Sequence, residues 1–314
     1  MAELKALALA QKVCNAQVVT YRERESNTLF LPDLLQEGVK DDRIFVVSWG
    51  FDVPKLVKQL AGHSVVYHAH SANYGFRLPA SVPIVTVSRN TLGYWGAQSP
   101  HSLIYYLPNE ISDEFCNPHP DRFLDREIDV LVQSRKSSQY LMQSLVPALQ
   151  TQCRVKVLSG FVESLSQEFR RSKVYLYDSS EYWAQQRVTE GFGLPPMEAL
   201  ASGCHVFSSV NHALSDYLDP GFNSHKIAGY STDYDSQRIL ACLQKPPQPL
   251  PEDFFSPYRS QNITDRWAVI LTELNQFFDY AQRSPSDIPA QTPWHLQTLR
   301  WRSKFDKFKK KLQR

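Results

Sequence analysis

Several features that would assign a sequence to a class of protein are scarce or missing here. No apolar run approaches the ~20 residues that span a bilayer, and the 314 residues carry a formal net charge of only +2. A charge so close to zero leaves no strong overall field for binding nucleic acid. The cysteines are odd in number and scattered, without a C-x-x-C pair, so the sequence indicates neither a zinc motif nor a disulfide framework. Reduced thiols in a cytoplasmic protein are the simplest interpretation.

Motifs of several enzyme classes are missing as well. The nine histidines show no H-E-x-x-H or related spacing, and no G-x-S-x-G elbow is present. We therefore predict no metal site and no cofactor. The Ala/Leu-rich start of the chain is interrupted by Glu3 and Lys5. This pattern predicts an amphipathic helix rather than a secretory signal.

Short β-branched runs alternate with helical patterns along most of the chain, which is typical of parallel α/β sheets. Two such sets predict two doubly wound domains in series. The predicted strands are Gln17–Tyr21, Arg43–Trp49, Ser64–His70, Val82–Ser88, Ser102–Leu107, Ile128–Gln133, Arg154–Ser159, Lys173–Tyr177 and His205–Ser209. The predicted helices include Val53–Leu60, Ser138–Leu149, Glu163–Arg171 and Pro195–Ser202.

A proline-rich, charged stretch over Asn109–Ile128 separates the two sets and suits a linker. We therefore place the domains at residues 1–120 and 121–285, and a helix over Thr264–Gln282 closes the second one. Residues 286–314 form a basic tail. If the tail is helical, one face holds Trp301, Phe305, Phe308 and Leu312. Such a helix suits either an anionic membrane surface or packing on another domain.

The segment from Thr189 to Ser208 has the chemistry of an anion-binding loop. Gly191 and Gly193 allow close backbone approach or positive φ. Pro195 and Pro196 suit the first turn of a helix. A loop that leads into a helix N-terminus at the end of a parallel sheet binds anions well, and a nucleotide diphosphate would fit there.

Glu190 and Glu198 lie on either side of this loop. Carboxylates repel a diphosphate but accept hydrogen bonds from sugar hydroxyls. One is therefore suited to the donor sugar and the other to the ribose. The alternative is a Gly/Pro turn that carries two surface glutamates.

The run E-G-F-G-L-P-P-M-E-A-L-A-S-G, which begins at Glu190, resembles the E-x7-E signature of retaining GT-B glycosyltransferases of family 4. The resemblance implies the GT-B fold, in which two Rossmann-like domains face each other across a cleft. It also implies that Glu190 holds the transferred sugar, while Glu198 binds the ribose hydroxyls. The donor-binding loop between them is implied to comprise Gly191, Phe192, Gly193 and Leu194.

The segment Asp129–Ser138 resembles the family's first donor-domain strand and loop, where an arginine and a lysine grip the diphosphate. Here Arg135 and Lys136 are adjacent, and Ser134 replaces the usual glycine. The sequence leaves open which cation does the main work, and two solvated cations are the alternative. Either one can neutralise a leaving diphosphate.

The segment Ser64–Ser71 resembles the strand that delivers a histidine to the cleft, and His70 at its carboxyl end is the better match. The resemblance implies that His70 lies near the donor sugar, although a strand-end histidine is also common as a structural residue. Family members usually begin with a strand and a glycine-rich loop that helps to receive the acceptor. This sequence starts in a helix and shows neither.

The implied reaction is transfer of a sugar from a nucleoside diphosphate sugar to a hydroxyl of a glycan or lipid-linked glycan, with retention and without a metal. The triplet Asp233-Tyr-Asp235 has the D-x-D form of a metal signature from another glycosyltransferase fold, but we expect it to cap a helix. The expected location is the cytoplasm, including the inner membrane face. The alternatives are a non-catalytic, nucleotide-binding scaffold and a sugar-nucleotide hydrolase or phosphorylase on the same fold.

Overall fold

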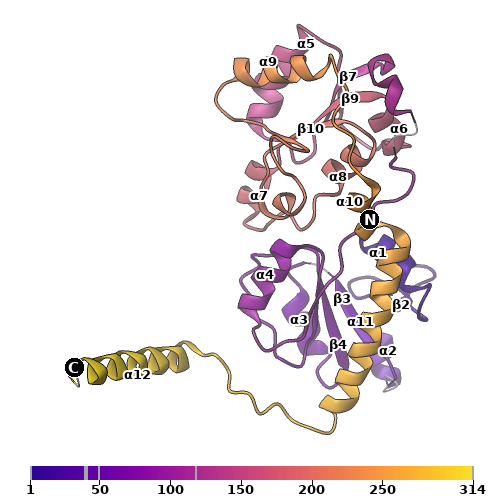
Figure 1. Ribbon diagram of the computed structural model, residues 1–314. Helices are drawn as coiled ribbons and strands as arrows, with labels where there is room; N and C mark the ends of the chain where they lie inside the picture. Colours follow the sequence, from indigo (N-terminus) through magenta and orange to yellow (C-terminus); the bar gives the residue numbers. More distant parts are fainter. Residues whose placement is uncertain (1, 39–41, 49, 117–118, 313–314) are drawn as a thin grey trace.

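The computed structural model describes the whole chain except residues 1, 39–41, 49, 117–118 and 313–314. It shows two α/β lobes, one above the other, and a separate helix on a long connection (Figure 1). Trp49, at the end of one predicted strand, lies outside the described residues. Both main sheets contain only parallel pairs, as the alternation of strands and helices predicted.

The sheet of the lower lobe has four strands in the order β3-β4-β5-β6. Its core centres on Tyr67 and Trp95, which are fully buried with ring centroids 5.1 Å apart. The strands are β3 (Ile44–Ser48), β4 (Ser64–Ala69), β5 (Ile84–Thr86) and β6 (Ile104–Tyr106), and the two-stranded sheet beside them pairs β1 (Val19–Thr20) with β2 (Leu29–Phe30). The helices are α1 (Ala2–Ala10), α2 (Leu31–Glu37), α3 (Val53–Gln59) and α4 (Arg89–Gln98).

The sheet of the upper lobe has five strands in the order β11-β10-β9-β7-β8. Val130 and Val174 in its middle strands are fully buried, because helices cover both faces. The strands are β7 (Ile128–Gln133), β8 (Val155–Leu158), β9 (Ser172–Tyr177), β10 (His205–Ser208) and β11 (His225–Lys226). The helices are a π-helical turn (Leu141–Leu145), α5 (Val146–Gln150), α6 (Leu165–Arg170), α7 (Ser180–Gln186), α8 (Leu194–Ala201) and α9 (Thr232–Cys242).

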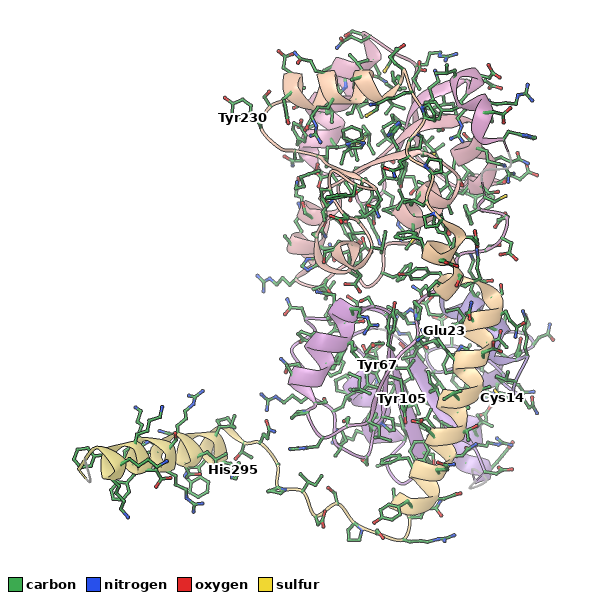
Figure 2. All side chains as sticks on the ribbon, viewed as in Figure 1. Cys14, Glu23, Tyr67, Tyr105, Tyr230 and His295 are labelled. Carbon is green, nitrogen blue, oxygen red and sulfur yellow. The ribbon has the colours of Figure 1, made fainter. Side chains whose placement is uncertain are left out.

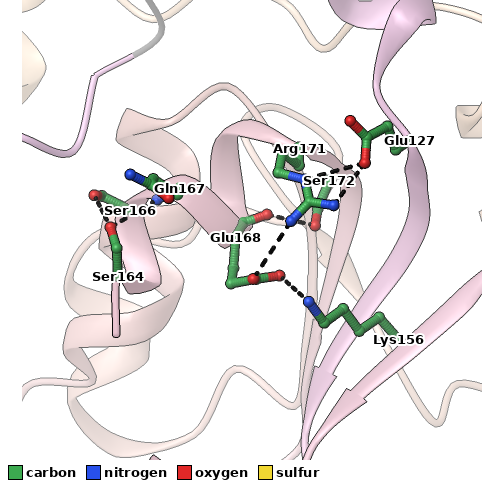
Figure 3. Close-up of polar contacts among 8 residues, drawn as sticks. All are labelled: Glu127, Lys156, Ser164, Ser166, Gln167, Glu168, Arg171 and Ser172. Carbon is green, nitrogen blue, oxygen red and sulfur yellow. Dashed lines mark hydrogen bonds and ion pairs between the residues drawn. The ribbon is translucent and has the colours of Figure 1, made fainter. Parts of the chain in front are cut away.

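Charged side chains fix α6 to the edge of this sheet (Figure 3). Glu168 accepts from Lys156 of β8 at 2.7 Å, and its second oxygen lies 3.7 Å from Arg171. The same arginine pairs with Glu127 at 2.6 Å, and Ser172 donates to the carbonyl of Glu168 at 2.6 Å. Because most of these side chains are partly exposed, the network sets the position of the helix more than it adds stability.

All nine predicted strands correspond to strands of the structure. The helices that the sequence analysis did not predict include α2, α4 and α7. Helix α4 contains two glycines, Gly93 and Gly96, which weaken its helical pattern. It forms because Ser88 and Thr91 make a reciprocal capping box and Trp95 is buried. Tertiary burial and a good cap outweigh the propensity of its residues.

The cap of α9 differs from the prediction. Ser231 is the N-cap residue, and its hydroxyl accepts from the backbone N–H of Tyr234. Asp233 and Asp235 lie in the first turn of the helix. Asp235 is fully buried, and it accepts 2.8 Å hydrogen bonds from Tyr140 Oη and from a backbone N–H of the preceding loop. The prediction that the aspartates cap α9 was therefore wrong in position, because a serine one residue before the helix does so.

After α10 (Glu252–Phe255), the long helix α11 (Ser260–Ala281) returns to the lower lobe (Figure 1). Its buried side chains Trp267, Ile270 and Leu274 pack with Val66 and Val85 of the lower sheet. The sequence pattern had placed this helix in the second domain. The structure places it on the first, because its apolar stripe covers the face of β4 and β5 that α3 and α4 leave open.

The helix α12 (Pro293–Leu312) extends away from both lobes, with side chains reaching into solvent around it (Figure 2). Four aromatic side chains on it are 60–75% exposed: Trp294, Trp301, Phe305 and Phe308. Across the described part of the chain, no helix combines the length and the apolarity needed to cross a bilayer.

The packing of α11 on the lower sheet is testable with two substitutions in one helix. Leu274→Ala should lower the free energy of unfolding by about 2–5 kcal/mol, because Leu274 is 1% exposed in the joint core. Val269→Ala is the matched control, since Val269 is 61% exposed, and it should change stability by less than about 0.5 kcal/mol. Urea unfolding measures both, and equal effects would contradict the packing.

Candidate active site

The loop between β9 and β10 approaches the lower lobe at Gly191 and turns into α8 at Gly193. Gly193 has φ 82°, in the left-handed region that favours glycine, and a Cβ there would lie 2.2 Å from a methyl carbon of Leu214. Tyr217 donates a 2.5 Å hydrogen bond to the Gly193 carbonyl. Pro195 and Pro196 then form the first turn of α8, as the sequence predicted. The loop and the helix N-terminus are therefore rigidly placed.

Glu190 is buried and held by four side chains. Its Oε2 accepts from Tyr177 Oη at 2.5 Å, Trp183 Nε1 at 2.7 Å and Ser179 Oγ at 3.2 Å. Its Oε1 lies 3.6 Å from Lys136 Nζ. One carboxylate oxygen is thus anchored, while the other faces a cation. The sequence analysis missed the three donors. Tyr177 was nevertheless the last residue of a predicted strand, at the carboxyl end of the sheet, where the residues of such a site are expected.

The structure shows different environments for Arg135 and Lys136, which the sequence could not distinguish. Lys136 has φ 68°, an unusual conformation for a residue with a side chain. Its ammonium group lies 4.3 Å from the ring centroid of Trp183, beside Glu190. Arg135 is exposed, and the described residues offer it neither an ion pair nor a hydrogen bond. Lys136 is therefore the cation that the fold brings to Glu190.

Glu198 lies in the second turn of α8 and is 5% exposed. Burial raises its pKa to about 7, an effect that Lys5 opposes and Glu114 reinforces. Lys5 Nζ on α1 lies 4.0 Å from its Oε1, at the outer limit of an ion pair. The N-terminal helix therefore reaches one of the two motif glutamates, a contact that no feature of the sequence indicated.

His70 follows β4, and its ring lies against that of His68, with Nε2 of His70 3.2 Å from Nδ1 of His68. Burial lowers the pKa of His70 to about 4, so its imidazole is neutral at pH 7. The backbone of His70, rather than its ring, meets the loop of the upper lobe. A Cβ built on Gly191 would lie 1.6 Å from the His70 carbonyl oxygen, so only glycine fits at that position.

Hydrogen bonds join the two lobes on both sides of the contact between Gly191 and His70. Thr189 accepts from Ser71 Oγ at 2.6 Å through its carbonyl, and it exchanges two further hydrogen bonds with the backbone of Ala72. On the other side, the Asp216 carboxylate of the upper lobe accepts from the backbone N–H groups of Arg89 and Asn90, which begin α4. Both lobes thus contribute to one continuous interface.

Phe192 and Leu194, the remaining residues of the predicted donor loop, pack against neighbouring side chains. The Phe192 ring is buried, 5.7 Å from the rings of both Tyr217 and Tyr258. Leu194 lines a narrow cavity together with Lys5 and His68. This cavity has room for about one water molecule. A sugar nucleotide can enter this place only if the groups around the cavity move apart.

No protein-family model matches the chain, and no curated protein matches it significantly. Solved structures do match. The GtfA/B complex is 14% identical with a TM-score of 0.50, over 78% of this chain and 59% of that one. TarM is 12% identical with a TM-score of 0.50, over 79% and 57%. Anabaena Alr3699/HepE in complex with UDP is 15% identical with a TM-score of 0.47, over 78% and 79%.

The chain spans about three fifths of the length of the first two structures. At such low identity the similarity establishes the fold alone, and it confirms the predicted GT-B architecture of two Rossmann-like domains. The roles of the individual site residues follow from neither comparison.

The raised pKa of Glu198 predicts a specific pH dependence of stability. Between its ordinary pKa of 4.5 and about 7, the folded chain keeps a proton that the unfolded chain releases. Stability should therefore fall as pH rises through this window, by about 3 kcal/mol at most. Glu198→Gln should remove that slope and make the protein more stable than wild type at pH 8.

Urea unfolding at pH 5 and pH 8 measures the effect. Glu163→Gln is the control, because Glu163 is exposed and its substitution should leave the slope unchanged. A wild-type slope that persists in Glu198→Gln would contradict the assignment.

Proposed function

We propose that this chain is a glycosyltransferase, which transfers a sugar from a nucleoside diphosphate sugar to a hydroxyl of a glycan or lipid-linked glycan. The observation that carries the proposal is the arrangement of the two motif glutamates. Glu190 and Glu198 stand at the two ends of a loop and helix N-terminus, both buried where the lobes meet, with Lys136 beside the first. The GT-B fold supports the proposal, since such folds place substrates between their domains.

In the proposed complex, the anchored carboxylate of Glu190 accepts from hydroxyls of the transferred sugar through Oε1, the oxygen that faces Lys136. Glu198 accepts from the ribose once Lys5 has moved from its 4.0 Å contact. Lys136 and the N-terminus of α8 meet the negative charge that builds on the leaving diphosphate. His70, neutral at pH 7, is proposed to orient the sugar after the lobes open.

Two finer features of the reaction rest on the resemblance and on the position of the charges. Retention of configuration is proposed from the E-x7-E motif. Independence of a metal is proposed because Lys136, Arg135 and a helix N-terminus already provide positive charge. Asp235 of the D-x-D triplet supports this, since it is fully buried and bonded to Tyr140 and Arg238. Its carboxylate thus has structural partners on both oxygens.

The two adjacent cations give the sharpest test. Lys136→Ala should lower kcat/KM for the donor by at least ~100-fold, the usual effect of removing an electrostatic contact to the developing charge. Arg135→Ala, the matched neighbour, should lower it by less than ~10-fold, because Arg135 is exposed and lacks a partner in the described structure. Release of nucleoside diphosphate from a panel of sugar nucleotides measures the rates, with and without added Mn²⁺.

Other outcomes of this assay would replace the proposal. If no donor turns over while nucleoside diphosphates still bind by calorimetry, the chain is a non-catalytic scaffold. Release that is independent of every acceptor would identify a hydrolase. A strict requirement for Mn²⁺ would refute metal independence, and wild-type activity of Lys136→Ala would remove Lys136 from its proposed role.

We further propose that α12 holds the protein on an anionic membrane, where a lipid-linked acceptor would be reached. Trp294, Trp301, Phe305 and Phe308 are 60–75% exposed, and helical spacing places all four on one face. The same helix carries Arg300, Arg302, Lys304, Lys307, Lys309 and Lys310 against a single acid, Asp306. Aromatic side chains between basic ones complement the acyl boundary and the anionic headgroups of a bilayer.

Liposome flotation tests the role of α12. The full-length protein should float with vesicles that contain phosphatidylserine and stay unbound with neutral ones, because each basic residue near the surface contributes about 1 kcal/mol. The double variant Trp301→Ser, Phe305→Ser should lose flotation, whereas exchange of the exposed Phe222 of the upper lobe for serine should not. Equal flotation of wild type and double variant would identify α12 as a helix with another partner.

A further inference from the structure

Three metal-ligating side chains from three different elements meet in the upper lobe. His205 begins β10, His225 begins β11, and Cys242 ends α9. One ligand atom from each residue lies within 4.8 Å of the others. Within the described parts of the chain, no second group of three histidine, cysteine or acidic side chains comes together in this way. Their spacing along the sequence matches no metal motif, so only the fold reveals the cluster.

The distances within the cluster suit a bound ion. Cys242 Sγ lies 3.7 Å from His225 Nε2. Zinc binds sulfur at about 2.3 Å and nitrogen at about 2.0–2.1 Å, so two such ligands at a tetrahedral angle lie about 3.6 Å apart. The observed distance between the sulfur and the nitrogen is thus close to the distance between two ligands of a tetrahedral zinc ion.

The third ligand is oriented by a hydrogen bond to the backbone. His205 Nε2 lies 2.9 Å from the carbonyl oxygen of Lys245. A carbonyl only accepts, so the proton of His205 is on Nε2 and its lone pair is on Nδ1. A histidine that binds a metal characteristically donates its other N–H to a carbonyl or carboxylate in this way. The hydrogen bond to the backbone therefore leaves Nδ1 of His205 as the nitrogen available to a metal.

Aromatic packing adds rigidity to the cluster. The ring of His225 stacks on Phe207 at 4.4 Å between centroids, with the planes 20° apart. The guanidinium of Arg238 lies 5.4 Å from the centroid of the Phe207 ring and 3.2 Å from Asp235, which partly offsets its charge. Two imidazoles and a thiolate suit zinc, whereas magnesium and calcium prefer oxygen ligands.

We propose that His205, His225 and Cys242 form a zinc site, with a water molecule in the fourth position. On binding, the Cys242 thiol releases its proton to solvent and the thiolate takes the ion. The site lies at the amino end of β10, whereas the proposed donor site lies at the carboxyl ends of the upper strands. The ion therefore lies away from the proposed sugar transfer.

The element that gains most from such an ion is β11. This edge strand has two residues, and its register joins only Phe207 to His225 and Ser208 to Lys226. So short a strand has little stability of its own. An ion shared by β10, β11 and α9 would fix the edge of the sheet and the end of the helix together.

Cobalt, which replaces zinc and reports thiolate binding through a charge-transfer band, tests the proposal on the full-length protein. Wild type should bind one Co²⁺ per chain, show that band, and lose it when Zn²⁺ is added. Cys242→Ala should lose the band, and His225→Gln should weaken Co²⁺ binding at least tenfold. Cys153→Ala, which removes a partly buried thiol of the same lobe, should keep both properties.

A second measurement needs no variant. Zinc should slow alkylation of Cys242 in wild type by at least tenfold, as followed by mass spectrometry, while the exposed Cys14 reacts at an unchanged rate. Equal alkylation of Cys242 with and without zinc would overturn the proposal, as would an undiminished charge-transfer band in Cys242→Ala. Either result would identify the 3.7 Å contact as a thiol hydrogen bond to His225.

Discussion

The contact between the Gly191 backbone and the His70 carbonyl determines how the rest of the site is arranged. A Cβ at residue 191 would lie 1.6 Å from that oxygen, so the lobes can meet here only because residue 191 has no side chain. The hydrogen bonds of Thr189 to Ser71 and Ala72 follow from this approach. So does the placement of the two motif glutamates, which flank the contact. The interface and the candidate site are one piece of structure.

The two glutamates are buried alike but stabilised very differently. Glu190 has three hydrogen-bond donors on one oxygen and a cation near the other. Glu198 has a single ammonium group at 4.0 Å, and its pKa is raised by burial. A buried carboxylate with so few partners is costly for folding, and such groups are often retained because a ligand completes them. Glu190 is thus already organised, whereas Glu198 lacks partners that a bound ligand would supply.

The strands, the glycine-rich loop and the start of α8 could be predicted from local patterns in the sequence. This is because apolar runs and the positions of glycine and proline depend directly on the local backbone conformation. They could not show which of Arg135 and Lys136 reaches the site, since that depends on the left-handed backbone at Lys136. Nor could they reveal Trp183 or Lys5, whose roles arise from contacts between distant segments. The spacing of apolar residues correctly predicted the helix α11. The same spacing could not indicate which of the two sheets the helix covers.

The packing of the late helix α11 on the lower lobe also has a consequence for folding during synthesis. The lower sheet is complete by β6, yet Val66 and Val85 lack the side chains of Trp267 and Ile270 until α11 has been made. At about 5–20 residues per second, a ribosome needs roughly ten to thirty seconds to synthesise the intervening upper lobe. During that interval the nascent lower lobe exposes part of an apolar sheet face to solvent. Apolar surface of this kind makes a nascent chain prone to aggregate, and the docking of α11 removes it.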